Sequence, residues 1–176
     1  MSILEFNRII IIGNNGSGKS FLAKELAKIT NLPLIHLDME FWREDWQKPE
    51  EKEWIAIQKS LIAKEKWIIE GNHSSTMELR FKATDLVIFL DINRFTCLIS
   101  VVKRHGKNRL GSPDYLNAKF NKDFFKFCKR LWDFPKDKRK LIIALHKKYP
   151  QKEFLIINSR KKANKLFELN KKIKII

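Results

Sequence analysis

The sequence lacks the features of disulfide-stabilised and membrane-spanning proteins. Only Cys97 and Cys128 of its 176 residues are cysteines, too few for a disulfide framework and not spaced as metal ligands. No apolar run approaches the roughly 18 residues that a membrane-spanning helix needs, and the first residues form no signal-peptide pattern. We therefore expect reduced thiols, a cytoplasmic location and no membrane contact.

Internal repeats, low-complexity segments and linkers between domains are also absent from the sequence. A chain of this length buries a substantial hydrophobic core within one unit. We therefore expect a single domain over residues 1–176.

Acidic residues are scarce in the second half of the chain. Residues 91–176 contain 24 Lys or Arg and 7 Asp or Glu, whereas residues 1–90 contain 12 and 13. Such asymmetry can indicate contact with nucleic acid. However, Lys outnumbers Arg by 27 to 9, and Arg is the better specific reader of phosphate groups. We therefore favour a lysine-rich, solvated surface, part of whose charge serves a nucleotide, over a surface that binds nucleic acid.

The segment GNNGSGKS, residues 13–20, has the spacing of a phosphate-binding loop (Walker A). It follows the apolar run at 9–12 and precedes a segment of helical periodicity, which is the strand–loop–helix context that this motif requires. Gly16 and Gly18 let the backbone N–H groups approach an anion closely, and the helix N-terminus adds partial positive charge. The motif predicts that the chain binds the triphosphate of ATP.

The residue types within this loop suggest separate roles. Lys19 is expected to reach the β- and γ-phosphates, and Ser20 to offer its hydroxyl to Mg²⁺. The other candidates for nucleotide binding are Gly13, Asn14, Asn15, Gly16, Ser17, Gly18 and Phe21.

Strand and helix patterns alternate along the chain. The expected strands cover residues 8–12, 33–37, 67–69, 86–90 and 154–157, and the expected helices cover 19–30, 52–63, 95–104, 116–132, 136–148 and 161–169. This alternation predicts a three-layer α/β fold, in which a five-stranded parallel sheet has helices on both faces.

Acidic side chains follow three of the expected strands, and ligands of such sheets bind at the carboxyl ends of strands. Glu70 is the candidate for holding a water molecule on Mg²⁺, with a solvated carboxylate as the alternative. Asp38 is expected to end the second strand, where a carboxylate can take a proton from a hydroxyl acceptor. Asp91 follows the fourth strand. Trp42, after Asp38, either stacks on a ring of the acceptor or covers the core.

The segment after the third strand supplies further candidates for acceptor binding. The complete set is Asp38, Trp42, Gly71, Asn72, His73 and Arg80. Arg80 has two other possible partners, Glu78 and Asp85. His36 is interpreted as a strand residue without a functional role, and it forms no metal site with His73.

Glycine, proline and basic residues around 105–116 predict a mobile lid. Arg104 flanks this segment and Arg109 lies within it. An Arg on a closing lid can stabilise the charge of a transferring phosphoryl group. The alternative for both residues is a solvated basic surface.

Five segments of the chain are IIGNNGSGKS, LIHLDMEFW, WIIEGNHSST, LVIFLDINR and a basic stretch that ends in FPKDKR. Together they resemble the adenylate-kinase-related P-loop proteins of the DNA topology modulation protein family, over almost the whole chain. The first segment is common to a vast superfamily, whereas HLDxxFW followed by xGNxS is much more selective.

This resemblance implies a nucleoside- or nucleotide-kinase-like P-loop NTPase fold, with strand order 2-3-1-4-5 and a helical lid over the triphosphate. It implies that residues 13–20 bind ATP and Mg²⁺ and that Glu70, where relatives usually have Asp, lies near the metal. Ser75 stands where relatives often have Arg, which weighs against a nucleotide as the acceptor.

Three functional hypotheses remain open at this point. The favoured one is a kinase that transfers the γ-phosphoryl group of Mg-ATP to a nucleoside, a nucleotide or another metabolite. The second is a DNA-associated P-loop ATPase or regulator, based on the basic second half. The third is a nucleotide-binding protein that has lost its transfer activity.

Overall fold

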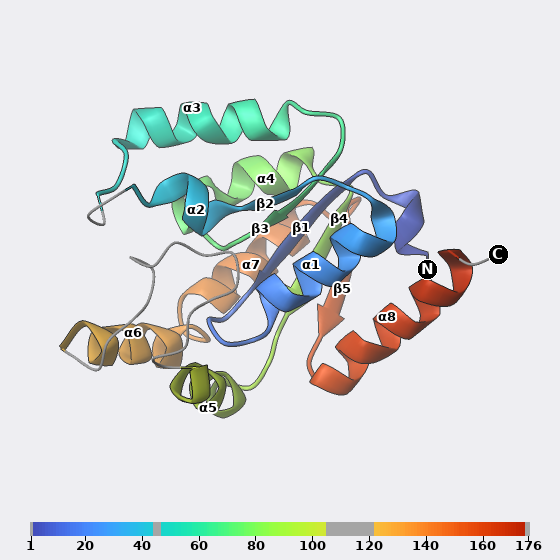
Figure 1. The fold of residues 1–176 in the computed structure, drawn as a ribbon. Helices are drawn as coiled ribbons and strands as arrows, with labels where there is room; N and C mark the ends of the chain where they lie inside the picture. Colours follow the sequence, from blue (N-terminus) through green and yellow to red (C-terminus); the bar gives the residue numbers. More distant parts are fainter. Residues whose placement is uncertain (1, 44–46, 105–121, 175–176) are drawn as a thin grey trace.

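The structure is a computed structural model that describes residues 2–43, 47–104 and 122–174. Five parallel strands form one sheet in the order β2-β3-β1-β4-β5 (Figure 1). The strands are β1 (Arg8–Gly13), β2 (Leu34–His36), β3 (Trp67–Glu70), β4 (Leu86–Leu90) and β5 (Glu153–Ile157). The predicted sheet and its strand order are therefore confirmed.

Helices connect these strands and cover both faces of the sheet (Figure 1). They are α1 (Lys19–Thr30), α2 (Leu37–Phe41), α3 (Glu51–Ile62), α4 (Met77–Ala83), α5 (Arg94–Arg104), α6 (Lys122–Asp133), α7 (Lys138–Lys148) and α8 (Arg160–Lys174), with short 3₁₀ turns η1 (Ile3–Glu5) and η3 (Ser74–Thr76). None of these described helices is both long and apolar enough to cross a membrane.

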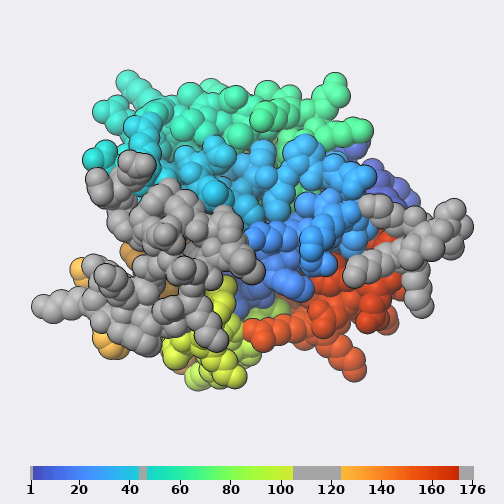
Figure 2. Space-filling view, in the orientation of Figure 1, coloured from blue at the N-terminus to red at the C-terminus, as the bar shows by residue number. Residues whose placement is uncertain are grey.

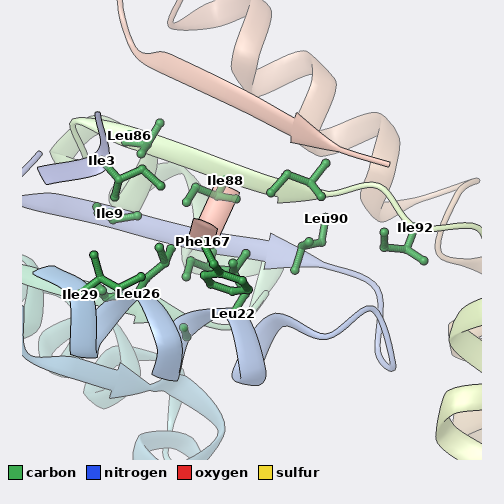
Figure 3. Close-up of a cluster of buried hydrophobic side chains, with 14 of the residues drawn as sticks. Ile3, Ile9, Leu22, Leu26, Ile29, Leu86, Ile88, Leu90, Ile92 and Phe167 are labelled. Atoms are coloured by element: carbon green, nitrogen blue, oxygen red, sulfur yellow. The ribbon is translucent and has the colours of Figure 1, made fainter. Parts of the chain in front are cut away.

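The hydrophobic core is divided by the sheet into two clusters, because successive residues of a strand point to opposite faces. Ile9 and Ile11 of β1 pack with side chains from α1, α6 and α8. Ile10 and Ile12 pack with side chains from α3, α4 and α7. Figure 3 shows the first cluster, in which Phe167 of α8 lies against β1 and α1. The space-filling view shows α1 and α8 side by side at the surface (Figure 2).

The central strands are buried on both faces, as their unbroken apolar runs predict. All four isoleucines of residues 9–12 and the run from Leu86 to Phe89 are fully buried. The register then places the strand ends together, because Glu70 pairs with Ile11 of β1 on one side and with His36 of β2 on the other. The residues that follow β1, β2 and β3 therefore meet at one edge of the sheet.

Two helices differ from the sequence prediction. No periodic pattern predicts α2 or α4, because five and seven residues are too few to show helical spacing. As a consequence, Asp38 does not end the second strand but lies in the first turn of α2. The start of the predicted helix at 116–132, and the predicted lid at 105–116, lie outside the described residues.

Candidate active site

The loop between β1 and α1 is shaped by glycines with positive φ. Gly13 (φ 148°) has no room for a side chain, because a Cβ atom would lie 2.5 Å from the carbonyl oxygen of Leu90. At Gly16 (φ 79°) a Cβ atom would lie 2.3 Å from the carbonyl oxygen of Cys97. Gly18 (φ 99°) instead faces open space, with no atom within 4 Å of a Cβ position. The loop therefore packs against β4 and α5 on one side and is open above Gly18.

Asn14 organises the interior of this loop. Its side chain is buried, donates a hydrogen bond to the carbonyl oxygen of Leu131 (2.9 Å) and accepts one from the backbone of Asn15 (2.8 Å). Its carbonyl oxygen accepts hydrogen bonds from the backbone of Ser17 (3.2 Å) and from Lys19 Nζ (3.1 Å). The Asn14 side chain therefore holds the loop against α6.

Glu70, at the end of β3, gathers three side chains. Its Oε2 atom accepts hydrogen bonds from Ser20 Oγ (3.1 Å) and from the Nδ1–H of His36 (2.9 Å). Its Oε1 atom lies 3.9 Å from Lys19 Nζ. Glu70 and Lys19 are both buried, with exposed fractions of 7% and 8%. The two charged residues proposed from sequence for nucleotide and metal binding therefore lie together.

The donor atoms around Glu70 suit Mg²⁺. This ion prefers oxygen ligands and retains several waters rather than being enclosed by protein. Ser20 Oγ and the Glu70 carboxylate supply oxygen atoms next to the open side of the loop. Among the described residues, no group of three or more His, Cys, Asp or Glu side chains could hold a metal alone. This donor set is thus typical of a cation held jointly by protein, water and a phosphate-bearing ligand.

A second cluster lies where α2 meets the segment after β3. His73 Nε2 lies 3.2 Å from Asp38 Oδ1, and the imidazole ring packs between Phe41 (4.5 Å between ring centroids) and Trp54 (4.9 Å). Asp38 is the more exposed partner, with 56% of its side chain accessible against 14% for His73. An exposed carboxylate that contacts a half-buried imidazole is suited to accept a proton from a bound hydroxyl group.

Gly71 and Asn72 connect the two clusters. Gly71 has φ 139°, and a Cβ atom there would lie 2.8 Å from Cβ of Leu37. The Asn72 side chain accepts a hydrogen bond from the backbone N–H of Gly13 (3.1 Å) and donates one to its carbonyl oxygen (2.8 Å). The amide group of Asn72, expected from sequence to contact the acceptor, is therefore engaged with the start of the phosphate-binding loop.

Arg80 lies below the site rather than in it. Its side chain is fully buried, and burial lowers its pKa to about 9. It pairs with neither of the acidic residues considered from sequence. Glu78 accepts hydrogen bonds from Lys148 and Tyr149, and Asp85 accepts one from the backbone of Arg8. The structure thus gives no support to direct contact between Arg80 and an acceptor.

Two aromatic candidates lie at the surface. Trp42 is half-buried and packs edge-on against Phe41 (4.9 Å). Phe21 follows the phosphate-binding loop, is 63% exposed and contacts Phe167 of α8 edge-on (6.0 Å). Trp42 therefore borders the Asp38 cluster, whereas Phe21 is a residue of α1 that faces α8.

The basic candidates are divided between described and undescribed residues. Arg104 is exposed at the end of α5, where its Nε atom donates to the carbonyl oxygen of Ser100 (3.1 Å). Arg109 lies outside the described residues.

Lys138, at the start of α7, was not singled out from sequence. The pKa of Lys138 is lowered by burial first and by the positive charge of Lys19 second.

The end of β4 is held by the corner between α6 and α7. Arg139 donates hydrogen bonds from Nε to both carboxylate oxygens of Asp91 (3.0 and 3.1 Å) and from Nη2 to Oδ2 (2.9 Å). The guanidinium of Arg94 lies 4.0 Å from the centre of a Trp132 ring. These contacts explain how the start of α7, with Lys138, is brought next to the loop.

Known structures with this arrangement identify the fold. Shikimate kinase from Acinetobacter baumannii, in complex with shikimate, is 15% identical and has a TM-score of 0.61, covering 97% of this chain and 96% of its own. The chain has the three-layer α/β P-loop fold. Shikimate kinase from Bacteroides thetaiotaomicron is also similar, with 18% identity, a TM-score of 0.54, and coverage of 97% and 99%.

Comparisons of the sequence identify no related family or protein. No protein-family model matches the chain, and a search of curated proteins finds no match. Membership of the topology modulation family therefore stays a prediction, whereas the three-layer α/β fold is shown by the solved structures.

Sequence reasoning missed His36, whose ring contacts Glu70, and did not consider Lys138 at the start of α7. His36 lies two residues before Asp38, at the edge of the sheet where β1, β2 and β3 end. This position at a strand end was the signal that could have identified it. Lys138 carried no local signal, because the corner between α6 and α7 is brought to the loop only by tertiary contacts.

Proposed function

We propose that this protein is an ATP- and Mg²⁺-dependent phosphotransferase whose acceptor is a small molecule with a hydroxyl group. The observation that carries the proposal is the convergence of Lys19 and Ser20 on Glu70, beside the open side of the loop at Gly18. This is the arrangement that a triphosphate and its cation require.

Each residue has a defined part in the proposed reaction. The backbone N–H groups of the loop bind phosphate oxygens, and Lys19 neutralises charge on the β- and γ-phosphates. Ser20 and Glu70 would hold Mg²⁺, which supplies charge neutralisation on the phosphate oxygens when bound. Lys138 would add a further positive charge on the α7 side.

Asp38 accounts for the preference for a hydroxyl acceptor. As the acceptor oxygen forms its bond to the γ-phosphorus atom, the bond from that atom to the bridging oxygen of ADP breaks. The hydroxyl proton passes to the Asp38 carboxylate, whose orientation is set by His73. An acceptor that is already an anionic phosphate would not need this proton transfer. A nucleoside, a hydroxylated acid such as shikimate and other metabolites all meet this requirement.

The test is the release of ADP from Mg-ATP by the purified protein, with Lys19→Ala as the control. The protein is assayed with a protein-free metabolite extract, with a panel that includes nucleosides and shikimate, and with plasmid DNA. We expect stimulation by a small-molecule fraction in the wild type and none in Lys19→Ala. Equal turnover by Lys19→Ala would contradict the proposal.

A DNA-associated ATPase is the second candidate, because residues 91–176 carry a net charge of +17. It predicts that only plasmid DNA stimulates ADP release and that the effect falls steeply with salt, since contacts to phosphates release counterions. Stimulation by DNA alone would replace the kinase proposal with this one.

A further inference from the structure

Arg80 is a buried positive charge with neutral partners. None of its side chain is exposed, and its lowered pKa of about 9 still leaves it protonated at pH 7. Within residues 2–43, 47–104 and 122–174, no carboxylate forms an ion pair with it. Burial of a charge is unfavourable, and an apolar side chain of similar size often stabilises such a position better. Stability alone therefore does not explain Arg80, and its role follows from the groups to which it donates hydrogen bonds.

The partners of Arg80 come from two sides. Its Nη1 atom donates to Gln58 Oε1 of α3 (2.6 Å) and to Thr76 Oγ1 (2.9 Å). Its Nη2 atom donates to the backbone carbonyl oxygens of Asn72 and His73, the latter at 3.2 Å. One planar group thus fixes the backbone of residues 72 and 73 against α3 and α4.

The side chains of these two residues reach different parts of the site. Asn72 forms both of its hydrogen bonds with the backbone of Gly13, where the phosphate-binding loop begins. His73 contacts Asp38, the proposed acceptor of the proton. Arg80 is therefore linked to the nucleotide side and to the acceptor side through two adjacent residues.

The backbone at His73 needs this support. Its φ of 33° and ψ of 78° lie in the left-handed region, which a residue with a side chain adopts at an energetic cost. The only other described non-glycine residue with positive φ is Asn31, which caps the end of α1. The bonds from Arg80 to the carbonyl groups of residues 72 and 73 hold the peptide units on both sides of the His73 Cα atom.

We propose that Arg80 is a positioning residue that fixes the phosphate-binding loop and Asp38 relative to each other, by holding the backbone of residues 72 and 73. The inference rests on the proposed function for the roles of the two parts it joins. It assigns Arg80 no contact with substrate.

The first test measures protection of the Gly13 amide from hydrogen exchange, which needs no ligand and no turnover. Arg80→Lys keeps the charge, but a single amino group cannot hold all four oxygen acceptors. We expect exchange at Gly13 to accelerate about 10-fold or more in Arg80→Lys and in Asn72→Ala. Unchanged protection in a folded Arg80→Lys protein would overturn the proposal.

The second test is a double-mutant cycle on the Kd of ATP, measured by titration. We expect Arg80→Lys and Asn72→Ala each to raise the Kd of ATP about 5- to 20-fold. The Kd of the double variant should not exceed that of the single variant with the higher Kd. This result is expected because Arg80 acts on the loop through Asn72. Independent losses that multiply in the double variant would contradict the inference.

Asn170 offers a matched control for a general loss of stability. Like Asn72, it accepts a hydrogen bond from a backbone N–H (Ile3, 2.9 Å) and donates one to a backbone carbonyl (Leu166, 2.8 Å). It is a buried residue of α8 that joins this helix to η1, and neither element contributes a residue to the site. Asn170→Ala is expected to lower thermal stability but to leave Gly13 exchange and ATP affinity within about twofold. If Asn170→Ala accelerates hydrogen exchange at Gly13 as much as Arg80→Lys does, then Arg80 contributes only to the overall stability of the protein.

A positioning role also predicts a separate effect on turnover once an acceptor is known. Arg80→Lys should lower kcat about 10-fold or more, and adding His73→Gln to it should lower kcat little further. If the wild type binds no ATP, the proposed function fails, whereas the exchange at Gly13 still decides whether Arg80 holds the loop. The two failures are therefore distinguishable.

Discussion

The two edges of the sheet both carry polar and charged side chains, but they hold them differently. At the edge where the strands begin, Asn7, Arg8, Glu65, Lys66 and Asp85 line a cavity of about 420 Å³. At the edge where β1, β2 and β3 end, the charged side chains of Lys19, Glu70 and Arg80 are buried and contact protein atoms. The first edge therefore has this cavity, and the second edge has the buried charged side chains.

The hydrogen bonds at the first edge account for its composition. Asp85 accepts a bond from the backbone of Arg8 (3.0 Å), Arg8 Nε donates to the carbonyl oxygen of Glu65 (3.3 Å), and Thr84 Oγ1 donates to the carbonyl oxygen of Arg8 (2.7 Å). These bonds satisfy backbone groups at strand ends, which is a structural requirement. The polar side chains of the first edge therefore have a structural explanation, whereas buried charges that contact one another are typical of functional sites, which makes the second edge the candidate site.

The largest expected effect on activity distinguishes the two edges when an aspartate at each is replaced by asparagine. Asp38→Asn removes the proposed proton acceptor and should lower kcat about 100-fold or more while changing ATP affinity less than about threefold. Asp85→Asn should leave kcat within about twofold. The measurement is steady-state kinetics with an acceptor identified by the screen, and a large loss in Asp85→Asn would remove the functional distinction between the edges.

Glu70→Gln tests the centre of the buried cluster. The amide cannot match the charge of the carboxylate beside Lys19 and Ser20, so the concentration of Mg²⁺ needed for half-maximal ATP binding should rise about 10-fold. Titration of ATP binding against Mg²⁺ provides the measurement. An unchanged Mg²⁺ requirement would contradict the role of Glu70 at the cation.

Gly16→Ala and Gly18→Ala separate packing from ligand binding within one loop. A Cβ atom at Gly16 would clash with the carbonyl oxygen of Cys97, whereas one at Gly18 would enter open space. We expect Gly18→Ala to weaken ATP binding about 10-fold with about 1 kcal/mol loss in unfolding free energy from its positive φ. Gly16→Ala should lose more stability. Thermal unfolding and ATP titration distinguish them, and equal losses of stability would show that the two positions do not differ.

The smallest effect on function is expected at the first edge. Thr84 is fully buried, and its hydroxyl group lies 2.7 Å from the carbonyl oxygen of Arg8 and 2.9 Å from that of Leu86. Thr84→Val removes this donor and should lower the unfolding free energy by about 1–2 kcal/mol without changing ATP affinity. Denaturant unfolding checks the first part, and a weakened ATP affinity would show that the two edges are coupled.

Much of the fold was predictable because its signals are local. The apolar runs at 9–12 and 86–90 identified two of the inner strands, and the glycine-rich segment predicted the turn that joins β1 to α1. The predicted helix at 19–30 matches α1. These features depend on residues that are neighbours in sequence, so composition and periodicity record them.

The acceptor side was less predictable because its contacts are tertiary. Asp38 and His73 are 35 residues apart, and the direction of each side chain depends on α2 and η3, which are too short to leave a periodic pattern. Arg80 was assigned to the acceptor because its burial beneath residues 72 and 73 cannot be read from its neighbours. The sequence therefore predicted the segments that form the candidate site, but not the contacts that its side chains make with one another.

The burial of β4 has a consequence for synthesis of the chain. Its residues, LVIFL, are apolar with high β-propensity, and in the fold they pair with β1 and with β5, whose residues 153–157 are synthesised much later. Until then the strand lacks one of its two partners, and an unpaired apolar strand is prone to intermolecular pairing. Asp85 and Asp91 flank it on either side, and their charges oppose such aggregation before they take up their structural roles in the finished protein.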